Sequence, residues 1–385
     1  MSTTTFTPAE TRLFKPLKVG NMTLQHRIVY PPLTRFRNDD EHVPLPMMVK
    51  HYADRAVIPG TLLISEATAI SPAEEGQKNN PGLTTEAQVA GWAKIYEAVH
   101  ARGSFFFQQL WGMGRAADPS YVKERGFDYR SSSAVAMPGV EAVPRAMTEE
   151  EIQETIRGFA ETAKRVVAAG GDGVELHGAH GYLLDQFLSD RVNQRTDKWG
   201  GSIENRARLM LECVRAVADA IGAERVGLRL SPYASFQSAE KSDIVGTYNY
   251  LIGELKAMKT PLAYLSLVEP IGDPSSVLLG KTAANLDKTL DFILEDWNNL
   301  TPVLVAGAYT PETAARAVEE RYSKWDVLIG FGRTYIANPD IVFRIKHGLA
   351  LNPYDRATFY VNKSEVGYND YPFSEEYLES VKNKA

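Results

Sequence analysis

The sequence predicts an α/β protein of the (β/α)8 barrel class, folded as a single domain over residues 1–385. Eight short runs of apolar and β-branched residues are each followed by a longer segment with helical character. Strands that alternate with helices in this way build a parallel sheet whose connections pack on its outside. No linker rich in glycine and serine divides the chain, and barrels commonly exceed about 200 residues as one unit. An open, doubly wound sheet is the main alternative.

The expected strands and helices alternate along most of the chain. We expect strands over 28–32, 61–66, 104–110, 173–177, 226–230, 263–267, 303–306 and 327–330. We expect helices over roughly 46–57, 86–102, 148–169, 202–221, 243–258, 286–297, 311–321 and 339–347. Two helix starts carry capping signals, because Thr148 precedes a run of glutamates and Thr310 precedes Pro311. Both signals favour helices at these positions.

Segments outside this alternation also have expected places. Residues 17–24 form two short runs around Gly20-Asn21, a pattern typical of a β-hairpin. We expect this hairpin to plug the bottom of the barrel. The connections 112–147 and 268–286 are long, and long loops in a barrel usually lie over its active face.

Composition limits the partners of the chain. A net charge of −6, a pI near 5.8 and the lack of a Lys/Arg cluster argue against a nucleic-acid surface. No apolar run is long enough to span a membrane, and the Thr-rich N-terminus lacks the features of a secretory signal. The single cysteine, Cys213, permits no internal disulfide and is expected to be a small buried residue. We therefore expect a cytoplasmic monomer or homodimer that acts on a small molecule.

Barrel enzymes carry their chemistry at the carboxyl ends of the strands. The residues expected at these ends are Thr34, Glu66, Gln109, Trp111, His177, His180, Arg229, Gly307, Gly332 and Arg333. The set is polar, cationic and aromatic, and Glu66 is its only acid. Because a glycosidase needs two facing carboxylates, this composition disfavours that class.

The segment 173–187 contains the most specific group of candidate residues. His177 and His180 follow the expected fourth strand, and Tyr182 follows them closely. Two imidazoles can donate hydrogen bonds to one oxygen that gains negative charge, and a phenol beside them can supply a proton. Catalytic zinc needs three protein ligands, and no third histidine lies at a strand end, so we expect no metal. A metal-assisted hydrolase or lyase and a pair of structural histidines remain the alternatives.

Two other strand ends suit an anion. Gly307 and the pair Gly332-Arg333 follow the seventh and eighth strands, where barrels usually bind phosphate. Glycines let backbone N–H groups approach an anion, and arginine can bind phosphate through two hydrogen bonds. Arg229 lies inside the fifth strand without a carboxylate in that strand, so a bound anion or an electron-rich ring is a natural partner. The alternatives are a surface arginine at a turn and an ion pair inside the barrel.

Several motifs run along the chain from residue 13 to about residue 373. They are LFKPL at 13–17, PLTR at 32–35, QLW at 109–111, HGAHGYLLDQF at 177–187, RTDKWGGSIENR at 195–206, LRLSP at 228–232, Gly332-Arg333, YDR at 354–356 and Tyr371-Pro372. In this order they resemble the Old Yellow Enzyme family of flavin-dependent ene-reductases. The segment 268–286 does not align with the family, so no substrate contact is expected from it by resemblance.

The resemblance implies a barrel that binds FMN without a covalent bond and uses NADPH as hydride donor. It implies reduction of the activated C=C bond of α,β-unsaturated carbonyl compounds, with hydride from flavin N5 and a proton from Tyr182. The residues it places at FMN are Pro32, Leu33, Thr34, Ala67, Gln109, His177, Arg229, Gly307, Gly332 and Arg333. The residues it places at the substrate are Trp111, His177, His180, Tyr182 and Tyr371. A barrel that binds a carbonyl or phenolic ligand without turnover is a third hypothesis.

Overall fold

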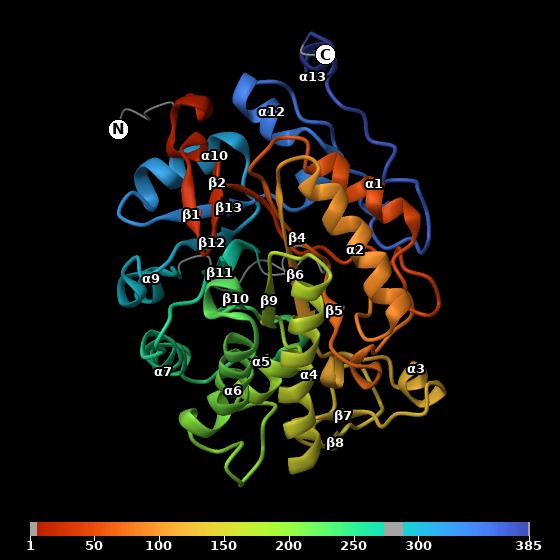
Figure 1. Ribbon diagram of the computed structural model, residues 1–385. Coiled ribbons are helices and arrows are strands. Elements are labelled where there is room, and N and C mark those ends of the chain that lie inside the picture. Colours follow the sequence, from red (N-terminus) through yellow and green to blue (C-terminus); the bar gives the residue numbers. More distant parts are fainter. Residues whose placement is uncertain (1–5, 273–287, 384–385) are drawn as a thin grey trace.

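Eight parallel strands close into a barrel in the computed structural model, which describes residues 6–272 and 288–383 (Figure 1). Around the barrel the order is β4, β3, β13, β12, β11, β10, β9 and β6, and β6 pairs with β4 to complete the ring. The strands are β3 (Ile28–Tyr30), β4 (Leu62–Ile64), β6 (Phe105–Trp111), β9 (Gly173–Gly178), β10 (Val226–Leu230), β11 (Tyr264–Val268), β12 (Val303–Ala306) and β13 (Val327–Gly330). The closed ring confirms the predicted barrel and excludes the doubly wound sheet.

Two strands end earlier than predicted. β3 stops at Tyr30 because Pro31 and Pro32 have no N–H to donate to a neighbouring strand. β4 stops at Ile64, and the chain resumes pairing with β6 only in the short strand β5 (Thr68–Ala69).

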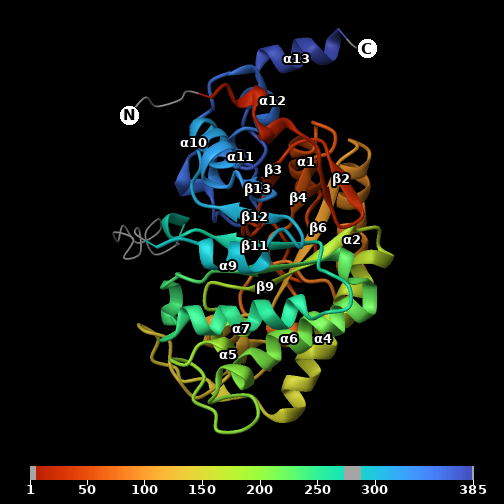
Figure 2. The same cartoon turned by 90° about the vertical axis from the view of Figure 1, so that its left-hand side faces the viewer.

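Helices surround the barrel on its outside (Figures 1 and 2). They are α1 (Pro46–Arg55), α2 (Glu86–His100), α4 (Glu149–Ala168), α6 (Ile203–Ile221), α7 (Ile244–Lys256), α9 (Asp291–Trp297), α10 (Pro311–Arg316) and α12 (Ile341–His347). Each corresponds to one predicted helix, although residues 286 and 287 of the predicted sixth helix lie outside the described residues. Thr148 and Thr310 cap α4 and α10 with both halves of a capping box, so these predicted helix starts are confirmed.

Several short elements were not predicted. They are α3 (Pro119–Glu124), α5 (Leu183–Leu188), α11 (Arg333–Ala337), α13 (Glu375–Lys382) and the strands β7 (Arg130–Ser131) and β8 (Arg145–Ala146). Most of these elements are too short to show a periodic apolar pattern in the sequence. Figure 1 shows that α13 projects from the barrel near the C-terminus.

The N-terminal hairpin closes the end of the barrel at which the strands begin, as predicted. Its strands β1 (Leu17–Val19) and β2 (Met22–Leu24) pair in antiparallel register. Val19, Met22 and Leu24 are buried in one cluster with apolar side chains from inside the barrel, such as Phe107. At the turn, Gly20 has φ +53°, and a Cβ there would collide with the carbonyl oxygen of Glu224. The position therefore requires glycine.

A second, larger apolar core lies between the strands and the helices. It joins outward-facing residues of the barrel, such as Val174 and Leu176, to helix residues such as Phe159 and Val214. Cys213 is buried in this core, and burial raises the pKa of its thiol well above the usual value. The prediction of a small buried cysteine is thus confirmed.

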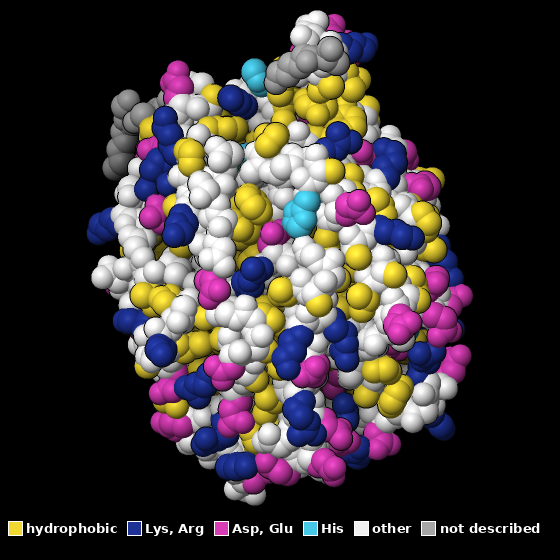
Figure 3. Space-filling model, in the orientation of Figure 1, with side chains coloured by type: hydrophobic (Ala, Val, Ile, Leu, Met, Phe, Trp, Pro, Cys, Tyr) yellow, Lys and Arg dark blue, Asp and Glu magenta, His cyan; other side chains and the backbone are white. Residues whose placement is uncertain are grey.

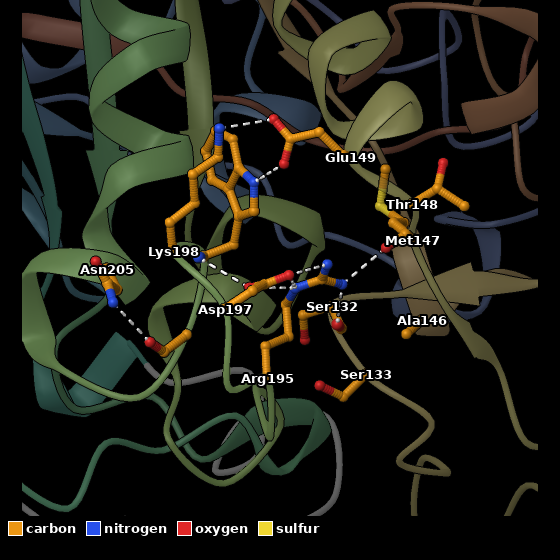
Figure 4. Close-up of polar contacts among 12 residues, drawn as sticks. Ser132, Ser133, Ala146, Met147, Thr148, Glu149, Arg195, Asp197, Lys198 and Asn205 are labelled. Atoms are coloured by element: carbon orange, nitrogen blue, oxygen red, sulfur yellow. Dashed lines mark hydrogen bonds and ion pairs between the residues drawn. The ribbon is translucent and has the colours of Figure 1, made fainter.

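The motif at 195–206 ties the loop before α6 to the long connection 112–147 (Figure 4). Arg195 donates hydrogen bonds to the carbonyl oxygens of Ser132 (3.1 Å) and Met147 (2.7 Å), and Asp197 pairs with its guanidinium at 2.6 Å. Lys198 forms an ion pair of 2.9 Å with Glu149 in the first turn of α4. These contacts give the motif a structural role away from the strand ends.

Charges of both signs are interspersed over the lower part of the face in Figure 3. Among the described residues, no helix is both long and apolar enough to cross a membrane.

Candidate active site

A cavity of about 400 Å³ lies at the carboxyl ends of the barrel strands. Its walls come from the segment after β3, from β10, from the segments after β12 and β13, and from residues 354–360 near the C-terminus. The predicted site residues in its lining are Pro32, Leu33, Thr34, Arg229, Gly307, Gly332 and Arg333. The fold thus brings together seven residues that are far apart in the sequence.

One end of the cavity suits a phosphate group. Gly307 and Gly332 follow β12 and β13, and both line the cavity. Arg333 begins α11 and donates a hydrogen bond to the hydroxyl of Tyr354 at 3.2 Å. Within the part of the chain that the structure describes, Arg333 forms no ion pair, so its charge is available to an anion.

Inside the barrel, a carboxylate lies close to Arg229. Glu175 belongs to the neighbouring strand β9, two residues before the partner of Arg229 in the register. It accepts hydrogen bonds from the Gln109 amide (2.7 Å) and from the Tyr264 hydroxyl (3.0 Å). Burial lowers the pKa of Arg229, and the negative charge of Glu175 opposes this effect. Arg229 also lines the cavity, and its Nε has no hydrogen-bond partner among the described residues. A bound ligand and a carboxylate inside the barrel were the two alternative partners predicted for Arg229. The structure is compatible with both at once, since Arg229 faces Glu175 and also lines the cavity.

The prediction that Glu66 is the only acid at a strand end is wrong. Glu269 directly follows β11, which extends one residue beyond the predicted strand. Its Oε1 accepts a hydrogen bond from the Tyr309 hydroxyl at 2.7 Å and contacts the Tyr322 hydroxyl. Because both phenols hold it outside the cavity lining, Glu269 does not form a facing pair with Glu66.

His177, His180, Tyr182 and Trp111 form an aromatic group at the end of β9. The ring centroid of His177 lies 5.6 Å from that of His180, 5.1 Å from that of Tyr182 and 6.1 Å from that of Trp111. Nδ1 of His177 and Nε2 of His180 are buried without a hydrogen-bond partner among the described residues. Such unpaired buried nitrogens are costly unless a ligand satisfies them.

Burial sets the protonation states of this group. It lowers the pKa of His177 and of His180 well below the ordinary histidine value, and nearby positive charges act in the same direction. It raises the pKa of the Tyr182 hydroxyl to about 12. At neutral pH the imidazoles are therefore uncharged hydrogen-bond donors, and the phenol keeps its proton.

Comparison with known proteins agrees with this geometry. Residues 12–352 match the model of the NADH:flavin oxidoreductase / NADH oxidase family. The chain belongs to this family. A crystal structure of Old Yellow Enzyme from Pichia sp. AKU4542 superposes with a TM-score of 0.87 at 39% identity, covering 95% of each chain. The resemblance drawn from the motifs is thus confirmed, and the protein is an oxidoreductase with the barrel of this family.

Curated fungal relatives extend over nearly the whole chain. Chanoclavine-I aldehyde reductase fgaOx3 of Penicillium roqueforti is 46% identical, covering 97% of this chain and 100% of that protein. Aldehyde reductase FrzD of a Cladobotryum species is 47% identical, covering 97% and 98%. A third relative, from Epichloe festucae var. lolii, is 45% identical over 97% and 98% and is named a probable inactive reductase, easA. The curated relatives thus include named reductases and one protein named as probably inactive.

The residues at the cavity fit the flavin of this family. The glycines after β12 and β13 and the unpaired charge of Arg333 suit a phosphate, and the free Nε of Arg229 suits an electron-rich ring. Thr34 lies in the cavity wall. Ala67 is buried in a cluster with Trp111, against which Tyr182 packs.

The structure places Tyr371 beside the segment 354–356. It is absent from the cavity lining, and its hydroxyl accepts a hydrogen bond from the backbone N–H of Asp355 at 2.9 Å. The C-terminal segment instead contributes Tyr354, Phe359 and Tyr360 to the lining. Only the YDR motif marked this segment in the sequence. Most of the long connection 268–286, from which no substrate contact was predicted, lies outside the described residues.

Proposed function

We propose that the protein is an FMN-dependent ene-reductase that uses NADPH to reduce the activated C=C bond of α,β-unsaturated aldehydes or ketones. The observation that carries this proposal is the group of two uncharged histidines with unpaired ring nitrogens and one protonated tyrosine. The ring centroids of His180 and Tyr182 lie 5.6 Å and 5.1 Å from the ring centroid of His177. A carbonyl that gains negative charge and then requires a proton nearby needs these two functions.

FMN would be held without a covalent bond. Arg333, Gly307 and Gly332 would bind its phosphate, and the remaining contacts would come from Pro32, Leu33, Thr34, Ala67, Gln109, His177 and Arg229. When bound there, FMN supplies the transfer of hydride from NADPH to the substrate. Arg229 would supply a fixed positive charge to the bound ring system, which would favour its electron-rich form.

His177 and His180 would hold the carbonyl oxygen of the substrate. Since both rings are uncharged, each can offer an N–H without the repulsion that two imidazolium ions would suffer. Negative charge on the oxygen strengthens these hydrogen bonds in the transition state. Loss of one such donor typically lowers the rate on the order of 10²–10³-fold.

Tyr182 would deliver the proton to the α-carbon. Its high pKa keeps the proton in place until charge has developed on the substrate. Trp111, whose ring centroid lies 4.5 Å from that of Tyr182, would form a wall of the substrate pocket. Tyr371 stays a predicted pocket residue without support from its position.

The relatives favour the substrate class and the reductant. Two of them are named aldehyde reductases, which supports an unsaturated carbonyl compound as substrate. Another, lnbE of Aspergillus flavus, is 46% identical and is named an NADP-dependent oxidoreductase, which supports NADPH. We further infer a cytoplasmic location from the single cysteine, which permits no internal disulfide. The monomeric or homodimeric state stays a prediction.

The test is an anaerobic titration of the purified protein, followed by its visible spectrum. We expect a yellow protein that NADPH bleaches and that 2-cyclohexen-1-one returns to yellow. A protein that stays colourless after incubation with FMN would contradict the cofactor. If NADPH bleaches the protein and neither cyclic enones nor enals restore the yellow colour, the second candidate would be supported, a protein that binds a ligand without turnover. Two relatives that are named as probably inactive favour this candidate.

A further inference from the structure

A buried ion pair lies beside the candidate active site and outside the cavity lining. Lys241, in the connection between β10 and α7, contacts the carboxylate of Asp185 on α5. The side chains are only 1% and 2% exposed. Charges buried so completely persist only where both partners and further hydrogen bonds are in place.

Asp185 also holds the turn that carries the catalytic candidates. Its second oxygen accepts a hydrogen bond from the backbone N–H of Gly181 at 2.9 Å. His180 and Gly181 both have left-handed backbones, with φ of +58° and +73°. A left-handed conformation is unfavourable for His180, so it requires support from its surroundings. Tyr182 follows directly and precedes the first residue of α5.

Lys241 belongs to a loop that is fastened to the same helix. On either side of it, the Ser189 hydroxyl donates to the carbonyl oxygen of Glu240 (2.6 Å), and the backbone N–H of Ser242 donates to Asp190 (3.0 Å). The loop thus joins α5 and the residues just after it at three successive positions.

The other end of this loop contacts the proton donor. Arg115 donates hydrogen bonds to the carbonyl oxygens of Gln237 (2.7 Å) and Ser238 (3.1 Å), which both have left-handed backbones. A Cβ at Gly181 would lie 2.8 Å from the Cβ of Gln237, so the loop packs directly on the turn. A hydrogen bond from the Gln237 side chain favours the ionised form of Tyr182, against the larger effect of burial.

We propose that Asp185 and Lys241 are positioning residues, whose ion pair holds His180 and Tyr182 in place for the protonation step. This inference rests on the proposed function, because it assigns the pair to one half of that reaction. The pair acts through the Gly181 N–H on one side and through the loop with Gln237 on the other. It contacts none of the residues expected at the phosphate of FMN, so we expect FMN to bind without it.

Two double variants of the FMN-loaded enzyme test the proposal. D185N/K241M removes both charges but keeps an oxygen for the Gly181 N–H, whereas D185L/K241M removes that acceptor too. We expect reduction by NADPH, and re-oxidation by ferricyanide, to stay within about twofold of wild type, because ferricyanide requires no proton at carbon. Re-oxidation by 2-cyclohexen-1-one should slow roughly tenfold in D185N/K241M and up to a hundredfold in D185L/K241M, since a misplacement of about 1 Å has effects of this order.

Hydrogen–deuterium exchange of the holoenzyme gives a readout that does not depend on activity. Peptides covering 178–184 and 235–242 should exchange at least tenfold faster in D185L/K241M, while peptides covering 195–206 stay unchanged. The matched control is D340N/R344M, which removes the buried ion pair between Arg344 on α12 and Asp340 just before that helix (2.7 Å). We expect this control to lower Tm without changing the ratio of enone to ferricyanide rates.

Three results would overturn the proposal. They are wild-type enone rates in both variants of the Asp185–Lys241 pair, an equal slowing with enone and with ferricyanide, or unchanged exchange at 178–184. If D185L/K241M does not fold, D185N/K241M decides by the same criteria. Failure of the proposed function is visible separately, because wild-type enzyme reduced by NADPH would then not be re-oxidised by any enone.

Discussion

Burial, more than pairing with opposite charges, sets the chemistry of single side chains at this site. His177, His180 and Tyr182 owe their uncharged states to burial within the barrel end. The sequence predicted which residues would meet, because each follows a strand. It could not predict their charge states or the proximity of Glu175 to Arg229, since both depend on which strands are neighbours.

Glu66 gives a prediction at the same scale. Burial raises the pKa of its carboxyl to about 7, and one of its oxygens has no hydrogen-bond partner among the described residues. Because the folded state binds this proton more tightly than the unfolded state does, protonated Glu66 contributes to the free energy of unfolding. This contribution is complete below about pH 4.5 and is lost as the pH rises through about 7. The free energy of unfolding of wild type, relative to E66Q, should fall by about 3 kcal/mol between these values.

Urea denaturation of both proteins across this pH range measures the difference. His26, whose pKa burial lowers to about 4, titrates in both proteins, so its effect cancels. A difference between wild type and E66Q that is constant with pH would contradict the protonated state of Glu66.

Elements with a long apolar pattern or a clear cap were predictable. All eight strands and their helices appear, and the capping boxes at Thr148 and Thr310 begin α4 and α10. The helices α5 and α11 were missed, although both begin next to residues of the site. Both are short, and tertiary contacts such as that of Asp185 with Lys241 hold α5 in place.

We expect the motif at 195–206 to stabilise the fold by holding the connection 112–147 and the start of α4, and to take no part in the reaction. R195M removes the donor to Ser132 and Met147, so we expect a loss of about 2 kcal/mol in the free energy of unfolding, typical for hydrogen bonds of a charged group. Urea denaturation measures this. R208M is the control, because the hydrogen bond of Arg208 to the Lys198 carbonyl is exposed, and it should change stability by less than about 0.5 kcal/mol. An equal or smaller loss in R195M would contradict the structural role.

At the scale of the whole molecule, closure of the barrel gathers the cavity residues from Pro31 to Tyr360. The alternation of strands and helices predicted the closed barrel, and the glycines after the last two strands predicted that Gly307, Gly332 and Arg333 would lie close together. They did not predict that residues 354–360 would form a wall of the cavity, because packing of a C-terminal segment over the strand ends leaves no periodic pattern in the sequence.

Binding of FMN should stabilise the whole chain in proportion to its affinity. At a free FMN concentration 100 times its Kd, the free energy of unfolding should rise by about 2.7 kcal/mol. R333M should raise Kd roughly 30-fold, as expected for loss of a charge-assisted phosphate contact, and leave about 0.9 kcal/mol at the same concentration. Equilibrium dialysis and thermal unfolding measure both effects. The exposed R316M on α10 serves as control, and equal Kd values for R333M and R316M would contradict the phosphate site.

The central claim is that Tyr182 supplies the proton after hydride transfer, and rapid-mixing kinetics of Y182F test it most directly. With each half-reaction followed separately, NADPH should bleach the flavin of Y182F within about twofold of the wild-type rate. Re-oxidation by 2-cyclohexen-1-one should slow by roughly 10²–10⁴-fold, the usual contribution of a general acid. Enone re-oxidation at the wild-type rate in Y182F would contradict the account.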